Sequence, residues 1–435
     1  MLLEAILLVG ATLSMITIVD SFSQPKASLL RIGIDPGRFV FRTWWARWKW
    51  CKYGHEAVRQ TYEQSKKTNY VTQTLMGDTI VLDPEFLNEL NMLPESKLSS
   101  TAVLVDTVMG QYNGIGAILL RDHLTSDVCR GPFTRHLAAF LPGMAEELQA
   151  AMVEKLGQST LENGDPVVCV AYELLFSFIH RISSVVFVGK ECCHNPIWTD
   201  AVTALPFDVE ITKFLLLPFP AFLRRFIAPL IPQRRRIFRH RAAVRDLLFP
   251  PSEAAKEEPS VMRLFSESGR DTDPYSLTGR LLLLTAAALH TSSMAITHAI
   301  FDLCAMPEYV EPLRSEAQKA LAQDNGEWKL STTKRLRRLD SFLKESQRLN
   351  QSTFLGFDRK VISPIELSDG KTTLPRGATI AVPGGPMARD PEFYDDPQRF
   401  DGFRFYRPDE DTDIVGFQLG WPILKLRWPR EGQMA

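Results

Sequence analysis

The sequence predicts a mainly α-helical fold with a minor β region, in one large domain that follows an N-terminal membrane anchor. The first observation is that apolar residues recur at helical spacing over most of the middle of the chain. The second is that the alternation typical of strands is confined to short early and late pieces. The third is the length of 435 residues, which is enough for one enzyme-sized domain. Together they predict a helical body with a small sheet built from both ends of the sequence.

The composition excludes several classes of protein. Lys and Arg number 50 and Asp and Glu 51, so the net charge of −1 lacks the positive excess of a protein that coats nucleic acid. With 45% hydrophobic and 23% charged residues, the chain is neither disordered nor a polytopic membrane protein. The six cysteines have no metal-ligand spacing, which favours a reducing, cytosol-facing environment.

The N-terminal segment is apolar enough to enter a membrane. Residues 2–19 carry a single charge, at Glu4, over a length close to the minimum for a bilayer-spanning helix. No Ala-x-Ala spacing follows, which disfavours a cleaved secretory signal. Basic residues are in excess after Asp20 and place the body in the cytosol. We expect residues 1–22 to be a single-pass anchor in the endoplasmic reticulum membrane, and the alternative is a buried core helix.

Two further segments carry the chemistry of a membrane surface. Residues 44–50 contain four tryptophans interleaved with Arg and Lys, which suits the lipid headgroup layer, although an ordinary amphipathic helix would have the same pattern. Residues 215–250 mix Phe, Leu and Pro with eight arginines. RNA binding is the alternative for this basic segment, but it lacks the tyrosines and glycines of a stacking platform. We therefore expect a membrane partner and no nucleic acid.

The helices of the body follow from apolar periodicity. Long helices are expected over residues 140–156, 168–188 and 281–305, and Pro307 is well placed to begin the next helix, over residues 308–322. The third helix has no formal charge for twenty residues after its start, yet seven Thr, Ser and His side chains there are too many polar groups for lipid. It is therefore expected to be a central buried helix whose polar groups surround a ligand.

Strands and loops follow from shorter patterns. Residues 78–82 and parts of 361–382 alternate as strands do, and Asp369-Gly370 marks a tight hairpin turn. Residues 250–259 combine prolines with charged side chains and are expected to form an exposed loop.

Charged residues in three late segments suggest one buried network. On an expected helix over residues 336–349, Glu345 and Arg348 are three positions apart, on one face and within pairing distance. Further along, Arg404 lies between aromatic residues, where its guanidinium could complete a Glu–Arg–Arg network with bidentate geometry. Taken singly, these residues also fit a solvated pair and an arginine stacked on surface aromatics. Their fixed order favours the network.

At these residues the sequence resembles the cytochrome P-450 family, specifically fungal microsomal monooxygenases of secondary metabolism similar to ent-kaurene and indole-diterpene oxidases. The resemblance covers nearly the whole chain and implies the cytochrome P-450 fold. It also implies that Glu345, Arg348 and Arg404 form the triad that locks the structure around heme, and that Arg135 and His136 contact the heme propionates.

The resemblance extends to the expected central helix. Residues 287–291, Ala-Ala-Leu-His-Thr, are similar to the family's AGxxT signature, with Ala288 in place of Gly. The resemblance gives Thr291 the catalytic role in oxygen activation. The structural alternative is that its hydroxyl bonds back to the carbonyl four residues earlier.

One departure from the family concerns the heme ligand. Heme-thiolate chemistry needs a cysteine on iron, and no cysteine follows Cys304 in this sequence. Over residues 416–426 the family's ligand motif is echoed, but Leu424 stands at the ligand position and cannot bind iron. We therefore expect residues 23–420 to be a cytochrome P-450-like catalytic domain that lacks the heme-ligand loop and the C-terminal part, followed by a non-family tail over residues 421–435.

Two functions remain open at this point. The resemblance implies a heme-dependent monooxygenase that oxidises an apolar, terpenoid-like small molecule in a fungal secondary-metabolite pathway, with electrons from an NADPH-dependent reductase. In that case the written C-terminus reflects truncation, a frameshift or a misplaced intron. The alternative is a non-catalytic, heme-free remnant that retains an apolar ligand pocket.

Overall fold

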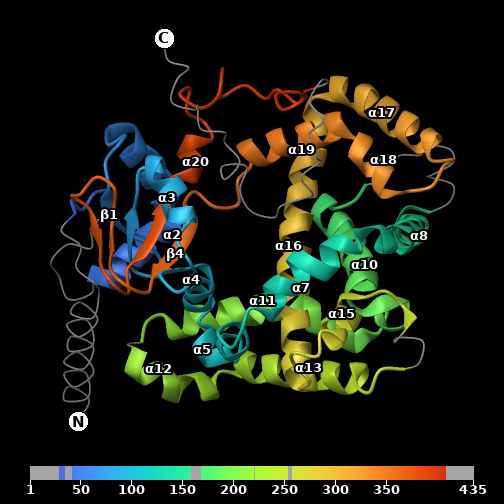
Figure 1. Ribbon diagram of the computed structural model, residues 1–435, viewed down its shortest axis with the longest axis horizontal. Coiled ribbons are helices and arrows are strands. Elements are labelled where there is room, and N and C mark those ends of the chain that lie inside the picture. Colours follow the sequence, from blue (N-terminus) through green and yellow to red (C-terminus); the bar gives the residue numbers. More distant parts are fainter. Residues whose placement is uncertain (1–28, 35–41, 158–167, 220, 253–256, 408–435) are drawn as a thin grey trace. The chain divides into compact units, whose positions relative to one another are not determined.

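The computed structural model describes residues 29–34, 42–157, 168–219, 221–252 and 257–407 (Figure 1). The expected anchor and tail, with Leu424, lie outside the described residues. The chain divides into two compact units. Unit 1 comprises residues 1–121, 208–236 and 352–397, and unit 2 comprises residues 122–207, 237–351 and 398–435.

Unit 1 holds the β structure, the long helix α2 and several short helices. Its five-stranded sheet has the order β1-β2-β7-β4-β3, and β5 and β6 form a separate hairpin. The strands are β1 (Tyr70–Gln73), β2 (Asp78–Val81), β3 (Leu98–Ser99), β4 (Gly356–Val361), β5 (Ile365–Glu366), β6 (Thr373–Leu374) and β7 (Thr379–Val382). The helices are α2 (Arg42–Gln64), η1 (Pro84–Phe86), α3 (Leu87–Asn91), α4 (Ser100–Thr107), α5 (Gly110–Asn113), α6 (Gly116–Leu119), α12 (Ala221–Ile227), η3 (Ala228–Leu230) and α20 (Gly384–Met387).

The sheet joins early and late sequence, as expected. Strand β2 pairs in parallel with β7, with Ile80 opposite Ile380, and both side chains are buried in the sheet's core. The expected turn closes the β5–β6 hairpin: Gly370 adopts a φ of +62°, and the Asp369 carboxylate accepts hydrogen bonds from the backbone N–H groups of Lys371 and Thr372. Glycine fits there because a side chain is disfavoured at positive φ.

Unit 2 is almost entirely helical. It contains α7 (Leu124–Val128), the π-helical turn η2 (Cys129–Phe133), α8 (Leu137–Leu156), α10 (Ala171–Cys192), α15 (Val261–Glu267), α16 (Pro274–Ala305), η4 (Pro307–Tyr309), α17 (Val310–Gln323), α18 (Leu330–Arg335) and α19 (Arg337–Leu349). Two more helices, α11 (Pro196–Leu216) and α13 (Pro232–Leu248), run across the boundary between the units. The helices expected from periodicity are all present, with ends shifted by a few residues.

Helix α16 is the centre of unit 2 and packs against both α10 and α19 (Figure 1). It begins at Pro274, seven residues before the expected start. The reason is a strong start signal: the Asp273 carboxylate accepts hydrogen bonds from two backbone N–H groups of the first turn, and proline occupies the first helical position. By length and hydropathy alone, α10 and α16 could each cross a membrane.

Three buried hydroxyls of α16 are satisfied within the helix. Thr285, Ser293 and Thr297 are buried, and each hydroxyl donates to the carbonyl four residues earlier, at 2.8, 2.7 and 2.7 Å. Such a hydrogen bond offsets the free-energy cost of removing a hydroxyl from water. These three hydroxyls are therefore satisfied without a ligand.

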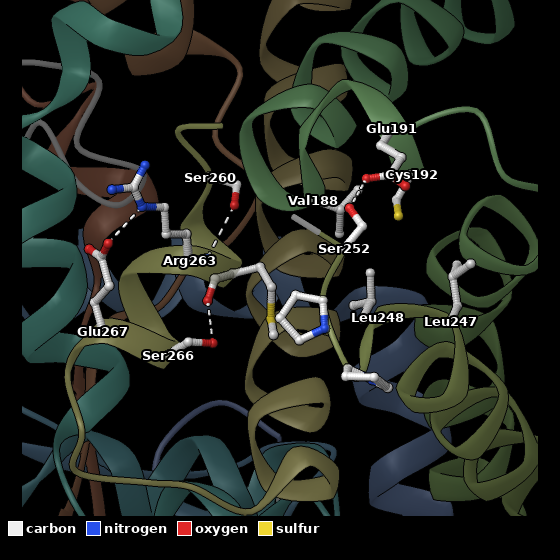
Figure 2. Close-up of a pocket in the computed structure, with 13 residues that line it drawn as sticks. Val188, Glu191, Cys192, Leu247, Leu248, Ser252, Ser260, Arg263, Ser266 and Glu267 are labelled. Atoms are coloured by element: carbon white, nitrogen blue, oxygen red, sulfur yellow. Dashed lines mark hydrogen bonds and ion pairs between the residues drawn. The ribbon is translucent and has the colours of Figure 1, made fainter. Parts of the chain in front are cut away.

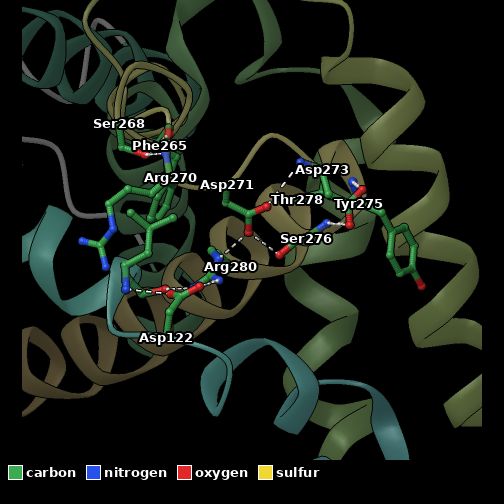
Figure 3. A network of polar contacts seen from close by, with 12 residues as sticks. Asp122, Phe265, Ser268, Arg270, Asp271, Asp273, Tyr275, Ser276, Thr278 and Arg280 are labelled. Atoms are coloured by element: carbon green, nitrogen blue, oxygen red, sulfur yellow. Dashed lines mark hydrogen bonds and ion pairs between the residues drawn. The ribbon is translucent and has the colours of Figure 1, made fainter.

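A buried arginine fixes the start of α16 (Figure 3). Arg280 has no exposed side-chain surface and forms ion pairs with Asp122 at 2.8 Å and Asp271 at 3.2 Å. Ser276 also donates to Asp271, at 2.6 Å. Because a buried charge is costly without partners, this network positions the first turns of α16 against the segment that leads into α7.

Candidate active site

The predicted ion pair between Glu345 and Arg348 is fully buried on α19. Arg348 Nε donates to Glu345 Oε2 and Arg348 Nη2 donates to Oε1, both at 2.7 Å. Helical spacing of three places the two side chains on the same face, and the planar guanidinium matches the carboxylate. Neither side chain has exposed surface, so the solvated alternative is excluded.

Arg404 completes the arrangement around Glu345. Its Nε lies 3.1 and 3.2 Å from the two Glu345 oxygens, and the Asp401 backbone N–H donates to Oε1 at 2.9 Å. The two guanidinium groups also share the Arg399 carbonyl as an acceptor, at 3.3 Å from Arg348 Nη2 and 3.0 Å from Arg404 Nη2. The structure therefore brings together all three residues of the predicted triad.

The pKa of Glu345 shows the balance of forces at this site. Burial acts to raise the pKa of this carboxyl, but hydrogen bonds and charge from Arg348, the Asp401 backbone and Arg404 hold it below its ordinary value. Glu345 is therefore a carboxylate at neutral pH. A carboxylate saturated by donors in this way supports neighbouring structure and is not available as a proton acceptor.

An aromatic cluster covers the same segment. Tyr309 packs with Phe342, Phe400 and Phe403 at ring-centroid distances of 5.5, 5.8 and 5.1 Å, and its hydroxyl accepts from the Gly402 backbone N–H at 3.1 Å. A Cβ on Gly402 would lie 2.7 Å from the Tyr309 ring. This cluster fixes the loop that carries Arg404. Sequence reasoning missed Tyr309, and no local signal could have linked it to a glycine 93 residues away.

Thr291 lies on an accessible face of α16. Its hydroxyl donates to the Ala287 carbonyl at 2.8 Å, which is the structural alternative expected for it. The side chain is nevertheless exposed, as are Ala287 before it and Met294 after it on the same face. Because the proton is committed to the helix, the oxygen lone pairs can still accept a hydrogen bond from a water or ligand on that face.

Next to Thr291, His290 has a different environment. Its ring packs against Phe176 and Phe207, with centroid distances of 5.3 and 5.8 Å, and its buried Nε2 has no hydrogen-bond partner among the described residues. Burial holds the pKa of His290 below its ordinary value, so the ring is neutral near pH 7. Only the fold reveals this aromatic contact, because Phe176 and Phe207 come from α10 and α11.

Arg135 and His136 lie apart from the triad. Both are exposed at the junction of η2 and α8, and the His136 Nδ1 contacts the Pro132 carbonyl at 2.7 Å. Within the described part of the chain, no hydrogen bond or ion pair links either residue to Glu345, Arg348 or Arg404.

A heme-thiolate site, which the sequence resemblance implies, needs a cysteine thiolate on the iron. The thiolate does not fit: the free cysteines are Cys51, Cys129, Cys169, Cys192, Cys193 and Cys304, and the expected ligand position holds Leu424.

A cavity of about 300 Å³ lies elsewhere in unit 2, between the ends of α10 and α13 and helix α15 (Figure 2). Val188, Leu248 and Met262 give it apolar walls, and Glu191, Arg263 and Glu267 give it charged edges. Arg263 pairs with Glu267 at 2.6 Å, so both charges are already compensated. None of the residues predicted for the active site lines this cavity.

Comparisons with known proteins identify one family to which the chain is similar. A family model for cytochrome P450 matches residues 118–418. The chain is 32% identical over 398 residues to an ent-kaurene oxidase of Gibberella intermedia, covering 90% of this chain and 75% of that protein. It is also 32% identical over 382 residues to the cytochrome P450 monooxygenase olcJ of Penicillium canescens, covering 84% and 71%.

A solved structure shows the same fold. Retinoic acid bound cyanobacterial CYP120A1 matches with a TM-score of 0.58, covering 80% of this chain and 76% of that chain. The identity in this match is 19%, so it speaks for the fold alone.

Proposed function

The chain belongs to the cytochrome P450 family, whose cofactor is heme, and from this premise we propose that it serves as a monooxygenase that oxidises an apolar, terpenoid-like small molecule in fungal secondary metabolism. The observation that carries the proposal is the fully buried carboxylate of Glu345, bound by Arg348 and Arg404. The name of the ent-kaurene oxidase relative supports a terpenoid-like substrate.

In this proposal the residues of the chain have separate tasks. Glu345, Arg348 and Arg404 hold the heme-facing core in place, and Thr291 binds and orients water on the accessible face of α16. The exposed Arg135 and His136 supply positive or hydrogen-bonding groups for propionates. Heme would supply the oxygen chemistry, and its ligand is the part that the sequence leaves open at Leu424.

A membrane location belongs to the same proposal. On α2 the exposed Trp45 and Trp48 rings stack at 5.1 Å, with Lys49 and Lys52 above them at 5.3 and 5.5 Å. Aromatic rings beside lysines suit the headgroup layer and support an endoplasmic reticulum protein anchored by residues 1–22, with its body in the cytosol. An NADPH-dependent reductase is the proposed electron donor.

The basic segment supports the membrane location as well. On α12, Phe222 and Phe226 are exposed beside Arg224 and Arg225, and the Arg225 guanidinium lies 4.6 Å from the Phe226 ring centre. This combination of exposed aromatic and cationic groups is typical of a surface that meets lipid headgroups.

A second function is favoured by Leu424. With leucine at the ligand position, the 435 residues would form a heme-free protein that binds an apolar ligand without activating oxygen. Both functions use an apolar pocket, so ligand binding alone does not separate them.

A reduced carbon-monoxide difference spectrum separates the two functions. The chain is expressed in microsomes with a heme precursor, and its folding is checked independently. A thiolate-type Soret band would support the monooxygenase for these residues as they stand. Folded protein without heme would support the binding function, and the monooxygenase would then require the genomic DNA near codon 420 to encode a cysteine-containing continuation in another frame.

A further inference from the structure

Three side chains of metal-ligand type meet where α8 packs against the end of α10. Glu147 comes from α8, and Cys193 and His194 come from the turn that follows α10, with one ligand atom from each residue within 4.8 Å of the others. We propose that Glu147, Cys193 and His194 bind a zinc ion, with a fourth position open to water. This site shares no residue with the triad or with Thr291, and it does not depend on heme.

The backbone around Gly189 is what brings the ligands together. Gly189 has a φ of +79° inside α10, which breaks the helical geometry one turn before Cys193. The Glu258 carboxylate accepts from the Lys190 backbone N–H at 2.9 Å, and a Cβ on Gly189 would lie 2.6 Å from that carboxylate. The kink therefore has a fixed shape that only glycine allows.

The distances agree with tetrahedral zinc. His194 Nε2 lies 3.3 Å from Glu147 Oε1. Zinc bonds to nitrogen and oxygen are about 2.0–2.2 Å long, so two such ligands at a tetrahedral angle are separated by roughly 3.4 Å. One edge of the coordination polyhedron thus already has its required length. Two present contacts would give way to the metal: the Cys193 sulfur now contacts the Lys190 carbonyl at 3.2 Å, and Glu147 Oε1 now accepts from Arg181 Nε.

The donor set also favours zinc over other metals. A thiolate, an imidazole and a carboxylate together are typical zinc ligands, whereas calcium and magnesium take oxygen ligands. Three protein ligands with one open position resemble the coordination number of an exchangeable zinc site more than that of a closed structural one.

The charges around the three ligands favour the binding of a divalent cation. The carboxylates near the site are Glu146, Glu147, Glu154 and Glu258, and the cations that pair with them are Lys155, Arg181 and Lys190. The nearby His180 is buried, and burial holds its pKa below the ordinary value, so it adds no positive charge at neutral pH. The four carboxylates and three cations leave an excess of one negative charge, and the thiolate that zinc binds would bring it to two, which a zinc ion would neutralise.

Zinc uptake at this site must release a proton. Burial, with the charges of Glu147 and Glu258, raises the pKa of Cys193 to about 11, so the free site holds a neutral thiol near pH 7. Zinc binds the thiolate and displaces that proton.

The neighbouring Cys192 provides a matched control. It lines the 300 Å³ cavity (Figure 2), whereas Cys193 is buried and belongs to the cluster. The two thiols are adjacent in sequence but face different surroundings. This also explains why spacing did not reveal the site: two ligands are neighbours in the chain, and the third lies on another helix.

The test is a zinc titration of the full chain against a chromophoric chelator, with zinc and iron counted separately by elemental analysis after dialysis. We expect one zinc per chain. The zinc affinity should fall by about tenfold or more in Cys193→Ser, and likewise in His194→Asn, which changes an exposed side chain. Cys192→Ser should bind as the parent does.

Cadmium provides a second readout. A thiolate-to-cadmium charge-transfer band should appear in the parent and in Cys192→Ser and be lost in Cys193→Ser. Equal zinc affinity in the parent and Cys193→Ser, or an equal loss in Cys192→Ser, would overturn the proposal. Both tests measure metal binding and not substrate oxidation, so their outcome does not depend on the monooxygenase function.

Discussion

Glu345 and Arg348 bind each other through two parallel hydrogen bonds of 2.7 Å, and neither side chain has exposed surface. Both residues lie within one turn of α19, so the pair does not itself connect distant parts of the chain. The connection comes from Arg404 and the Asp401 backbone, which bind the same carboxylate. Glu345 is thus the point at which α19 holds the late loop.

Removing this carboxylate should destabilise the protein strongly. Glu345→Ala leaves two buried or partly buried guanidinium groups without their anion, which costs about 3–5 kcal/mol of unfolding free energy. We also expect it to prevent stable heme incorporation in any heme-binding form. Denaturant unfolding followed by circular dichroism measures the first effect.

A matched control for this variant exists on α17. Glu311 and Arg314 also form an ion pair three residues apart, at 3.0 Å, but both side chains are exposed. Glu311→Ala should change the unfolding free energy by less than about 1 kcal/mol. Equal effects of the two substitutions would contradict the importance of burial at Glu345.

The same carboxylate should make stability depend on pH. The pKa of Glu345 in the folded protein lies below its ordinary value of 4.5, so its contribution is fully present above that pH and is lost as the pH falls through the folded-state value. Stability should therefore decrease with acid below about pH 4.5. Unfolding titrations at several pH values test this, and Glu345→Gln should show a shallower acid dependence than the parent.

The loop that carries Arg404 has no room for an additional methyl group. In Gly402→Ala the new Cβ would lie 2.7 Å from the Tyr309 ring and 2.8 Å from Phe342, so we expect a loss of roughly 1–3 kcal/mol. Gly131→Ala is the control, because its nearest neighbour is the flexible end of Arg135 at 3.8 Å. A melting temperature that is lowered only in Gly402→Ala would agree with this packing.

The sequence predicted the parts of the site that local spacing encodes. Glu345 and Arg348 lie one helical turn apart, so their pairing follows from geometry, and the pairing with Arg404 followed from motif order. Tyr309 could not be predicted, because its contact with Gly402 depends on how η4 meets a distant loop. Thr291 lies on α16 as predicted. Its hydroxyl donates to the Ala287 carbonyl, as the structural alternative expected, and its role in oxygen activation stays a prediction.

The start of α16 differs from the expected one. The helix was expected to begin at residue 281, whereas it begins at Pro274, so that Arg280 lies inside it and is fully buried. The Asp273-Pro274 pair is a typical helix start and would have corrected the boundary. The partners of Arg280 could not have been found in this way, because Asp122 is 158 residues away in sequence.

Arg280 should be more important for stability than its surface neighbour Arg270. Arg280→Met leaves the buried Asp271 without its cation and should cost about 3–5 kcal/mol. Arg270→Met removes an exposed pair with Asp127 and should cost at most about 1 kcal/mol. Chemical denaturation of both variants measures the difference, and similar midpoints would argue against an anchoring role for Arg280.

The last prediction concerns Thr291 and rests on the proposed monooxygenase function. Thr291→Ala removes an exposed hydroxyl, so the unfolding free energy should change little, while a heme-loaded form should release more hydrogen peroxide per NADPH consumed. The reason is that water bound at this hydroxyl is lost from the accessible face of α16, and oxygen reduction then separates from substrate oxidation. Thr285→Ala is the control, because that hydroxyl makes the same bond within the helix but is buried. Unchanged coupling in Thr291→Ala, or equal uncoupling in Thr285→Ala, would remove Thr291 from the mechanism.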